Sequence, residues 1–212
     1  MKNHVYIIGA SGFGREVENW ANLSKKFTKN YSIKGYIDID PAALDNYPSD
    51  YEVVGNDDYP FKSTDYAILA IADPLKKHDI ANRLKGRVKF LSFIADTAFI
   101  GKYVNIGEGS IIGPNCLITT NVEVGEFVCI LVGTAVGHDS VISDFSSIMV
   151  NVAIGGNAHI GEKSYIGSNS TLIPGISIGK GSKIGAGSVV VKDFPEGSFI
   201  YGNPAKNYPG VL

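Results

Sequence analysis

An aliphatic residue recurs every six positions from Ile94 to Val190, with no break in phase. All 17 positions of this series hold Ile, Val or Leu, and glycine directly follows ten of them. An amphipathic helix spaces its apolar residues three and four apart, and a half-buried strand spaces them two apart, so neither explains a period of six. Short strands and turns that repeat along a solenoid do explain it, and we predict such a solenoid here.

Each hexapeptide is expected to form one short strand and one turn. The aliphatic residue and the small or β-branched residue two positions before it should point inward, with glycine relieving the backbone where the chain bends. Three strands would make one triangular coil, and successive coils would stack about 4.8 Å apart. Residues 94–190 have room for five coils and part of a sixth. Because no long loop interrupts the phase, an active site on this prism must be shared with another surface.

Composition divides the chain near residue 93. Of its 19 basic and 21 acidic residues, 25 lie in residues 1–93 and only 11 in residues 94–190, whereas the same segments hold 6 and 16 of the 25 glycines. We therefore predict an α/β, Rossmann-like domain in residues 1–93, the β-helical prism in residues 94–191, and a C-terminal tail, residues 192–212, that packs on the prism.

The first 93 residues show the pattern of a small nucleotide-binding unit. The expected elements are a strand at 4–8, a Gly-rich turn at 9–16, a helix from Val17, strands at 33–37 and 66–72, a helix from Pro74 to about Lys85, and a strand at 88–93. The turn reads G-x-x-G-x-G, which is not the dinucleotide fingerprint, so phosphate binding and a simple tight turn both remain open. A parallel sheet with its ligand at the carboxyl ends of the strands, near Asp38, is the expected result.

Charge and composition argue against several classes of protein. The net charge is −2 and no Lys/Arg-rich run occurs, which argues against nucleic-acid binding. No window approaches the roughly 18 apolar residues of a membrane span, and residues 1–9 resemble a strand rather than a signal peptide, so the cytoplasm is the expected location. The two cysteines, Cys116 and Cys129, are expected to be packing residues rather than parts of a disulfide framework or zinc site.

One of the four histidines stands out as a candidate catalytic group. We expect His4 and His78 to be structural or exposed, and His159 to face outward from the prism. His138 should lie near a corner of the prism with Asp139 beside it, provided that the chain turns there. An imidazole with a pKa near ~6.5 can accept and return a proton at neutral pH, as a general base does.

Gly156 follows His138 by three hexapeptides, which make one full coil. The two residues should therefore stack at one corner about 5 Å apart. A free backbone N–H at Gly156 could hold an oxyanion, or Gly156 could be only a turn residue.

Taken together, the two blocks resemble the hexapeptide-repeat sugar-nucleotide N-acyltransferases that modify 4-amino-4,6-dideoxy sugars for polysaccharide biosynthesis, and their relatives that O-acetylate sialic acid. The resemblance covers essentially the whole chain, and five motifs carry it: Gly9-Ala10-Ser11-Gly12, Gly35-Tyr36-Ile37-Asp38, Gly137-His138-Asp139, Gly155-Gly156-Asn157 and Gly202-Asn203-Pro204-Ala205-Lys206. The last motif is common to many hexapeptide transferases. The resemblance implies a left-handed parallel β-helix and a homotrimer with its active sites at the subunit interfaces.

The resemblance also implies a reaction and a set of site residues. His138 would act as general base, with Asp139 raising its basicity, while the Gly156 N–H holds the thioester oxygen of acetyl-CoA, and no metal is required. The implied acetyl-CoA contacts are Ser147, Gly156, Ser168 and Ala186, and the implied sugar-nucleotide contacts are Ser11, Gly12, Phe13, Asp38 and Ala72.

Two residues depart from the family pattern. Relatives carry a second histidine nine positions after the first, where this chain has Ser147, and a histidine bordering the sugar, where this chain has Phe13. An acyl group longer than acetyl therefore stays open, as do the sugar stereochemistry and the nucleotide base.

Three other functions remain as alternatives. One is O-acetylation of sialic acid or another sugar hydroxyl. Another is a β-helical zinc hydratase, which needs three histidine ligands where the prism offers only His138 and His159. The third is a binding scaffold without catalytic activity.

Overall fold

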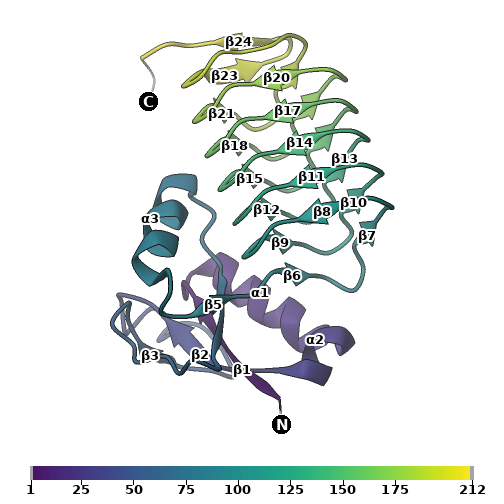
Figure 1. The fold of residues 1–212 in the computed structure, drawn as a ribbon. Helices are drawn as coiled ribbons and strands as arrows, with labels where there is room; N and C mark the ends of the chain where they lie inside the picture. The colour runs from purple at the N-terminus through teal and green to yellow at the C-terminus, as the bar shows by residue number, and fades with distance from the viewer. Residues whose placement is uncertain (1, 211–212) are drawn as a thin grey trace.

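The computed structural model describes residues 2–210 and contains two joined parts, an N-terminal α/β domain and a left-handed parallel β-helix (Figure 1). Both predicted architectures are confirmed. Met1 and residues 211–212, which belong to the expected N-terminal domain and C-terminal tail, lie outside the described residues.

The N-terminal domain is built on a five-stranded parallel sheet in the order β3-β2-β1-β4-β5. Its elements are β1 (Asn3–Ile8), α1 (Gly12–Leu23), α2 (Lys25–Asn30), β2 (Tyr31–Ile37), β3 (Val53–Gly55), β4 (Tyr66–Leu69), α3 (Pro74–Leu84) and β5 (Lys89–Phe90). The edge strand β3 is absent from the sequence prediction, because its three residues are too few to show a period. The strand order reverses between β1 and β4, and a ligand crevice is expected outside the carboxyl ends of these two strands.

The β-helix has three faces, each a ladder of two-residue strands, which we call the β13, β14 and β15 faces. The β13 face holds β7 (Phe99–Ile100), β10 (Leu117–Ile118), β13 (Ala135–Val136), β16 (Ala153–Ile154), β19 (Thr171–Leu172) and β22 (Val189–Val190). The β14 face holds β8 (Asn105–Ile106), β11 (Glu123–Val124), β14 (Val141–Ile142), β17 (His159–Ile160) and β20 (Ser177–Ile178). The β15 face holds β6 (Phe93–Ile94), β9 (Ile111–Ile112), β12 (Cys129–Ile130), β15 (Ser147–Ile148), β18 (Tyr165–Ile166), β21 (Lys183–Ile184) and β23 (Phe199–Gly202), with β24 (Ala205–Asn207) antiparallel to β23 at its end.

The parallel register between coils equals three hexapeptides, as in the pairing of Ala135 with Ala153. The last coil has fewer residues than the others: Ile184 pairs with Ile200, whereas a full coil would pair it with position 202. The sequence period ends at Val190 for this reason, although the ladder of the β15 face continues through β23.

The residues that we expected to point inward do line the interior of the β-helix. From Ile112 onward the aliphatic residue of each hexapeptide is buried, and so is the residue two positions earlier, which is often serine or threonine; Ile94, Ile100 and Ile106 in the first coils are only partly buried. These hydroxyls bridge coils: Ser140 Oγ donates to the Gly155 carbonyl at 3.2 Å and accepts from the Ala158 N–H at 3.2 Å. Buried hydroxyls of this kind have hydrogen-bond partners, so they cost little in an apolar interior.

The periodic glycines have a different cause from the one expected. The glycines that follow the aliphatic residue are not at the bend. A Cβ on Gly107 would lie 2.5 Å from the Gly125 carbonyl carbon of the next coil, so close stacking excludes a side chain. The left-handed backbone conformation falls two residues later in the repeat, where glycine alternates with Asn, Asp and other residues, as at Asn115 (φ 57°) and Gly133 (φ 71°).

Helix α3 and the loops after β1 and β4 join the two parts. Phe93, Ile111, Cys129 and Leu131 from the β-helix share one buried cluster with residues of the N-terminal sheet. Beside α3, the rings of Phe127 and Phe145 stack at 5.1 Å. Both cysteines are free and buried, as the packing role predicts.

The two kinds of glycine predict different effects of mutation. Gly107→Ala should lower the free energy of unfolding by about 1–3 kcal/mol, because the added methyl group overpacks the coil interface. Gly181→Asn should change it by less than about 0.5 kcal/mol, because no atom lies within 4 Å of its missing Cβ and Asn tolerates φ 67°. Chemical denaturation of both variants measures this, and equal losses would contradict the assignment of two causes.

Candidate active site

His138 and Asp139 lie at the corner between the β13 and β14 faces, which we call the His138 corner. Asp139 adopts φ 59°, so the chain turns between the two side chains and brings them together. The His138 Nδ1 lies 2.6 Å from Asp139 Oδ2. The side chains are 57% and 45% exposed, so the pair faces outward from the prism.

Asp139 is held as a carboxylate by two hydrogen-bond donors. Its pKa lies below its ordinary value of 3.8 because His138 and then Asn121 bind its oxygens. Asn121 lies one coil before Asp139, and its Nδ2 donates to Asp139 Oδ1 at 3.1 Å. With Nδ1–H donating to the carboxylate, His138 carries its lone pair on Nε2, which accepts no hydrogen bond within residues 2–210.

Gly156 lies directly against the His138 ring, as the spacing of one full coil predicts. A Cβ at Gly156 would be 2.7 Å from both Cε1 and Nε2 of His138, so only glycine leaves room for the ring. The neighbouring Asn157 N–H donates to the His138 carbonyl at 2.7 Å, whereas the Gly156 N–H donates to no acceptor in the described part of the chain. The corner thus places an unused N–H beside an imidazole Nε2.

Ser168 and Ala186 stack at a different corner, between the β15 and β13 faces, which we call the Ser168 corner. Each follows a strand of the β15 face, β18 or β21, by two residues, just as His138 follows β13. The two corners are opposite edges of the β13 face. One chain therefore does not bring Ser168 and Ala186 to His138 and Gly156.

Ser147 is also separated from His138, because it lies on β15 beneath helix α3. Its side chain is fully buried, and its Oγ accepts a hydrogen bond from Lys77 Nζ at 2.9 Å. The expected contact between Ser147 and the cofactor is not available in this arrangement, since α3 covers the hydroxyl.

Lys77 is itself a residue that the sequence does not single out. Its Nζ also donates to the Ser146 carbonyl at 3.2 Å and lies 3.4 Å from Cys129 Sγ, and its side chain is fully buried. Burial lowers the pKa of Lys77 from its ordinary value of 10.5, which the nearby Cys129 and Asp73 only partly oppose.

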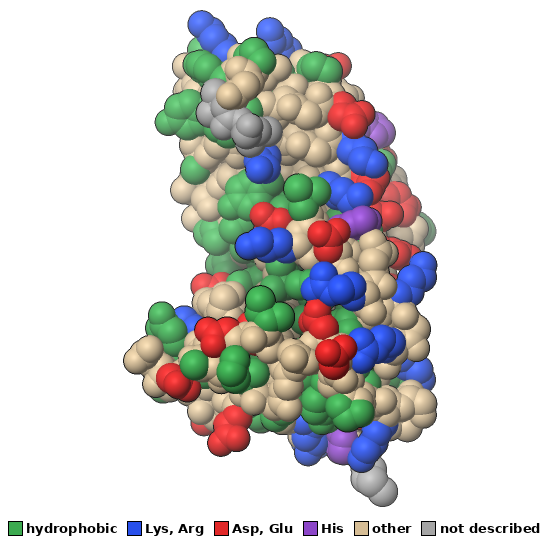
Figure 2. All heavy atoms as spheres, turned by 90° about the vertical axis from the view of Figure 1, so that its left-hand side faces the viewer, with side chains coloured by type: hydrophobic (Ala, Val, Ile, Leu, Met, Phe, Trp, Pro, Cys, Tyr) green, Lys and Arg blue, Asp and Glu red, His purple; other side chains and the backbone are tan. Residues whose placement is uncertain are grey.

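The expected sugar-nucleotide residues lie at the carboxyl ends of the N-terminal strands. Ser11 and Gly12 are exposed at the start of α1, Phe13 packs edge-on against Trp20, and Ala72 lies between β4 and α3. Hydrophobic side chains gather where this domain meets the β-helix (Figure 2).

Asp38 organises the Gly-rich turn. Its Oδ2 accepts the Ala10 N–H at 2.7 Å and its Oδ1 accepts the Asp40 N–H at 3.0 Å. Asp38 and Gly9 also line a cavity of about 320 Å³ that extends to Lys76 and Arg83. The turn is fixed by glycine as well, because a Cβ on Gly14 would meet the Gly9 carbonyl oxygen.

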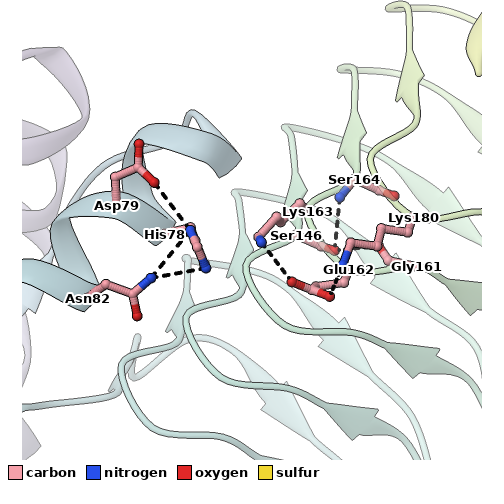
Figure 3. A network of polar contacts seen from close by, with 9 residues as sticks. All are labelled: His78, Asp79, Asn82, Ser146, Gly161, Glu162, Lys163, Ser164 and Lys180. Atoms are coloured by element: carbon pink, nitrogen blue, oxygen red, sulfur yellow. Dashed lines mark hydrogen bonds and ion pairs between the residues drawn. The ribbon is translucent and has the colours of Figure 1, made fainter. Parts of the chain in front are cut away.

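The other histidines have structural or exposed surroundings. His78 on α3 lies 3.3 Å from Asp79 and packs edge-on against Phe145, close to the corner where Glu162 pairs with Lys163 and Lys180 (Figure 3). His4 lies 3.8 Å from Asp65, and His159 is exposed on the β14 face.

Within residues 2–210, no group of three or more His, Cys, Asp or Glu side chains is placed to hold a metal ion. No helix in this range combines the length and the apolar character needed to cross a membrane.

Comparison with known proteins identifies related domains at both ends of the chain. Residues 4–84 match the PglD N-terminal domain, and residues 157–192 match the bacterial transferase hexapeptide repeats. No curated protein sequence matches the chain significantly.

Solved structures match over nearly the full length. PerB from Caulobacter crescentus, in complex with CoA and GDP-perosamine, is 25% identical with a TM-score of 0.83, covering 97% of each chain. WeeI from Acinetobacter baumannii is 28% identical with a TM-score of 0.80, covering 96% of this chain and 99% of its own. The acetyltransferase domain of PglB from Neisseria gonorrhoeae, with acetyl coenzyme A, has the same fold at 24% identity and a TM-score of 0.83, covering 98% of this chain and all of its own.

The buried Lys77 predicts a pH-dependent difference in stability. Between its lowered folded-state pKa and 10.5, the unfolded chain binds more protons than the folded chain, so native stability rises with pH in that window. The native protein should therefore gain stability relative to Lys77→Met as the pH rises through this window toward 10.5. Denaturation across this pH range measures the difference, with Lys76→Met on the exposed side of α3 as control; parallel curves for native protein and Lys77→Met would contradict it.

Proposed function

We propose that this chain, an acyltransferase that joins a PglD N-terminal domain to a hexapeptide-transferase β-helix, transfers the acetyl group of acetyl-CoA to the 4-amino group of a nucleotide-linked 4-amino-4,6-dideoxyhexose. The observation that carries the proposal is the His138 corner, where a carboxylate-bound imidazole lies against Gly156 and its unused N–H. These are the base and the oxyanion donor that acyl transfer to an amine requires.

The reaction is a direct transfer. His138 Nε2 takes a proton as the sugar amine attacks the thioester carbonyl carbon, and the Gly156 N–H binds the oxygen as it becomes an oxyanion. The tetrahedral intermediate collapses by breaking the carbon–sulfur bond, and the imidazolium returns its proton to the leaving thiolate. Asp139 holds the Nδ1–H and stabilises the imidazolium between these steps, as a carboxylate does in other histidine-based transfers.

The related structures support this choice of substrates. PerB was solved with CoA and GDP-perosamine, a nucleotide-linked 4-amino sugar, and the PglB domain with acetyl coenzyme A. Because nucleotide sugars and acetyl-CoA are cytoplasmic metabolites, we propose the cytoplasm as the location of the reaction.

The nucleotide sugar is proposed to bind at the carboxyl ends of β1, β2 and β4. The open N-terminus of α1 at Ser11 and Gly12 offers backbone N–H groups to the phosphates. Asp38 would border the nucleoside, with Phe13 and Ala72 toward the sugar. Ser147 is left out of the proposed cofactor contacts because Lys77 and α3 enclose it.

A homotrimer would complete the cofactor site. Acetyl-CoA can contact both the His138 corner and the Ser168 corner only if they come from different subunits, since one chain holds them at opposite edges of the β13 face. The outward residues of that face are all uncharged: Phe99, Leu117, Ala135, Ala153, Thr171 and Val189. An uncharged face of small and apolar residues suits packing against a second copy.

The acceptor assignment is tested by thiol release from acetyl-CoA with a panel of nucleotide-linked 4-amino-4,6-dideoxyhexoses and their 4-hydroxy counterparts. We expect release only with the amino sugars. Release that depends on the hydroxyl alone would favour O-acetylation and contradict the proposal.

Removing the base should abolish most of the activity. His138→Ala should lower kcat by at least about 10²-fold, because general base catalysis typically contributes that much. His159→Ala, an exposed histidine on the neighbouring face, is the matched control and should retain full activity. Equal activity of the two variants would contradict the assigned role of His138.

A charge on the β13 face should disrupt the trimer. Ala153→Arg would place an unpaired cation in the subunit interface, so the protein should become monomeric and lose acetyl transfer. Ser177→Arg, on the β14 face, should keep the native mass. Size-exclusion chromatography with light scattering measures both, and an unchanged mass for Ala153→Arg would contradict this interface.

A further inference from the structure

Asn121 forms the third member of a hydrogen-bonded chain that ends at the His138 imidazole. Asn121 and Asp139 occupy the same place in successive coils, with φ 57° and 59°, and the Asn121 Nδ2 reaches Asp139 Oδ1 at 3.1 Å. The other carboxylate oxygen, Oδ2, binds His138 Nδ1 at 2.6 Å. Asn121, from the preceding coil, thus binds Asp139 Oδ1, the carboxylate oxygen that His138 leaves free.

We infer that Asn121 is a positioning residue, which orients the Asp139 carboxylate and through it holds His138 with Nδ1 protonated and Nε2 free. This inference rests on the proposed function for its consequence in catalysis. The physical need is clear: Asp139 is 45% exposed, so without a second anchor its carboxylate can rotate and exchange His138 for water. A rotated carboxylate would release the imidazole from the geometry that proton transfer requires.

Backbone preference alone does not explain this contact. Asn is common at the left-handed positions of this β-helix, because its short polar side chain tolerates φ > 0. Asn115, one hexapeptide earlier, has φ 57° and is exposed, but its side chain makes no hydrogen bond within residues 2–210. Asn121 therefore meets the local backbone requirement and also makes a specific hydrogen bond. Asn115, which lies at the Ser168 corner, is a matched control for measurements made without the cofactor.

Few other charges act on this corner. In order along its stacked coils, its titratable side chains are Lys102 and Tyr103, then His138 and Asp139, then Lys192 and Asp193. The positions next to the pair, Asn121 below and Gly156 and Asn157 above, carry no charge. Position 121 also has Lys102 one coil before it, whose carbonyl accepts the Asn121 N–H at 3.1 Å, and Glu123 on β11. A negative charge introduced at position 121 would act on these two groups as well as on His138 and Asp139, and the pKa shift expected for His138 comes from the part that reaches the imidazole.

The first test removes the side chain without straining the backbone. Asn121→Gly keeps a residue that accepts φ > 0, so it should fold, and its kcat for acetyl transfer should fall about tenfold with KM little changed. Lys163→Gly, at the third corner of the β-helix between the β14 and β15 faces, carries the same kind of backbone change at φ 58° and should keep the native kcat. Equal kcat values for the two variants would overturn the inference.

The second test adds a charge at the same place. Asn121→Asp puts a carboxylate beside Asp139, which favours the imidazolium and should raise the pKa of His138. The acidic limb of the pH profile of kcat/KM should therefore move to higher pH. A loss of activity with an unmoved limb would indicate a merely structural role and overturn the inference.

A third measurement does not depend on the substrate. Nitrogen NMR of the His138 ring should show the Nδ1–H tautomer in the native protein and in Asn115→Gly, and a mixed population in Asn121→Gly. If no sugar in the panel is acetylated but the tautomer follows Asn121, the proposed function fails and the positioning role is supported. If the tautomer is the same in all three proteins, the positioning role is overturned whatever the sugar panel shows.

Discussion

The hydrogen bonds between coils fix each residue of the β-helix above its counterpart three hexapeptides earlier, and the rest of the structure depends on this register. It aligns the buried aliphatic residues into one core and places a hydroxyl where it can bridge two coils. It also brings successive coils so close that a Cβ is excluded at positions such as Gly107. A strand of two residues has little stability alone, so the core and the ladders form together.

The same register assembles the candidate site. His138, Gly156 and Asn121 are far apart along the chain but belong to three consecutive coils at one corner. The left-handed turn at Asp139 brings two neighbouring side chains together, which an extended strand would not do. The backbone at this corner is like that at the other corners of the β-helix. The side chains of Asn121, His138 and Asp139, together with Gly156, distinguish it from them.

Much of this could be predicted from the sequence because the period is strict. The solenoid, the inward positions and the stacking of Gly156 on His138 all follow from counting hexapeptides and whole coils. The sequence could not show why glycine follows the aliphatic residues, because close contact with the next coil and a left-handed backbone would both place glycine at intervals of six residues. The burial of Ser147 under Lys77 depends on how α3 docks against the β15 face, and no local pattern encodes that docking. The Asn121 contact does have a signal, because Asn121 lies one full coil before Asp139, but asparagine at a turn is too common to stand out.

A crystal structure of the protein with CoA and a nucleotide-linked 4-amino-4,6-dideoxyhexose would test the assembled site most directly. We expect the sugar amine within hydrogen-bonding distance of His138 Nε2, the CoA sulfur beside Gly156, and the pantetheine between the His138 corner of one subunit and the Ser168 corner of another. CoA bound on another face, or a sugar amine remote from His138, would contradict this arrangement.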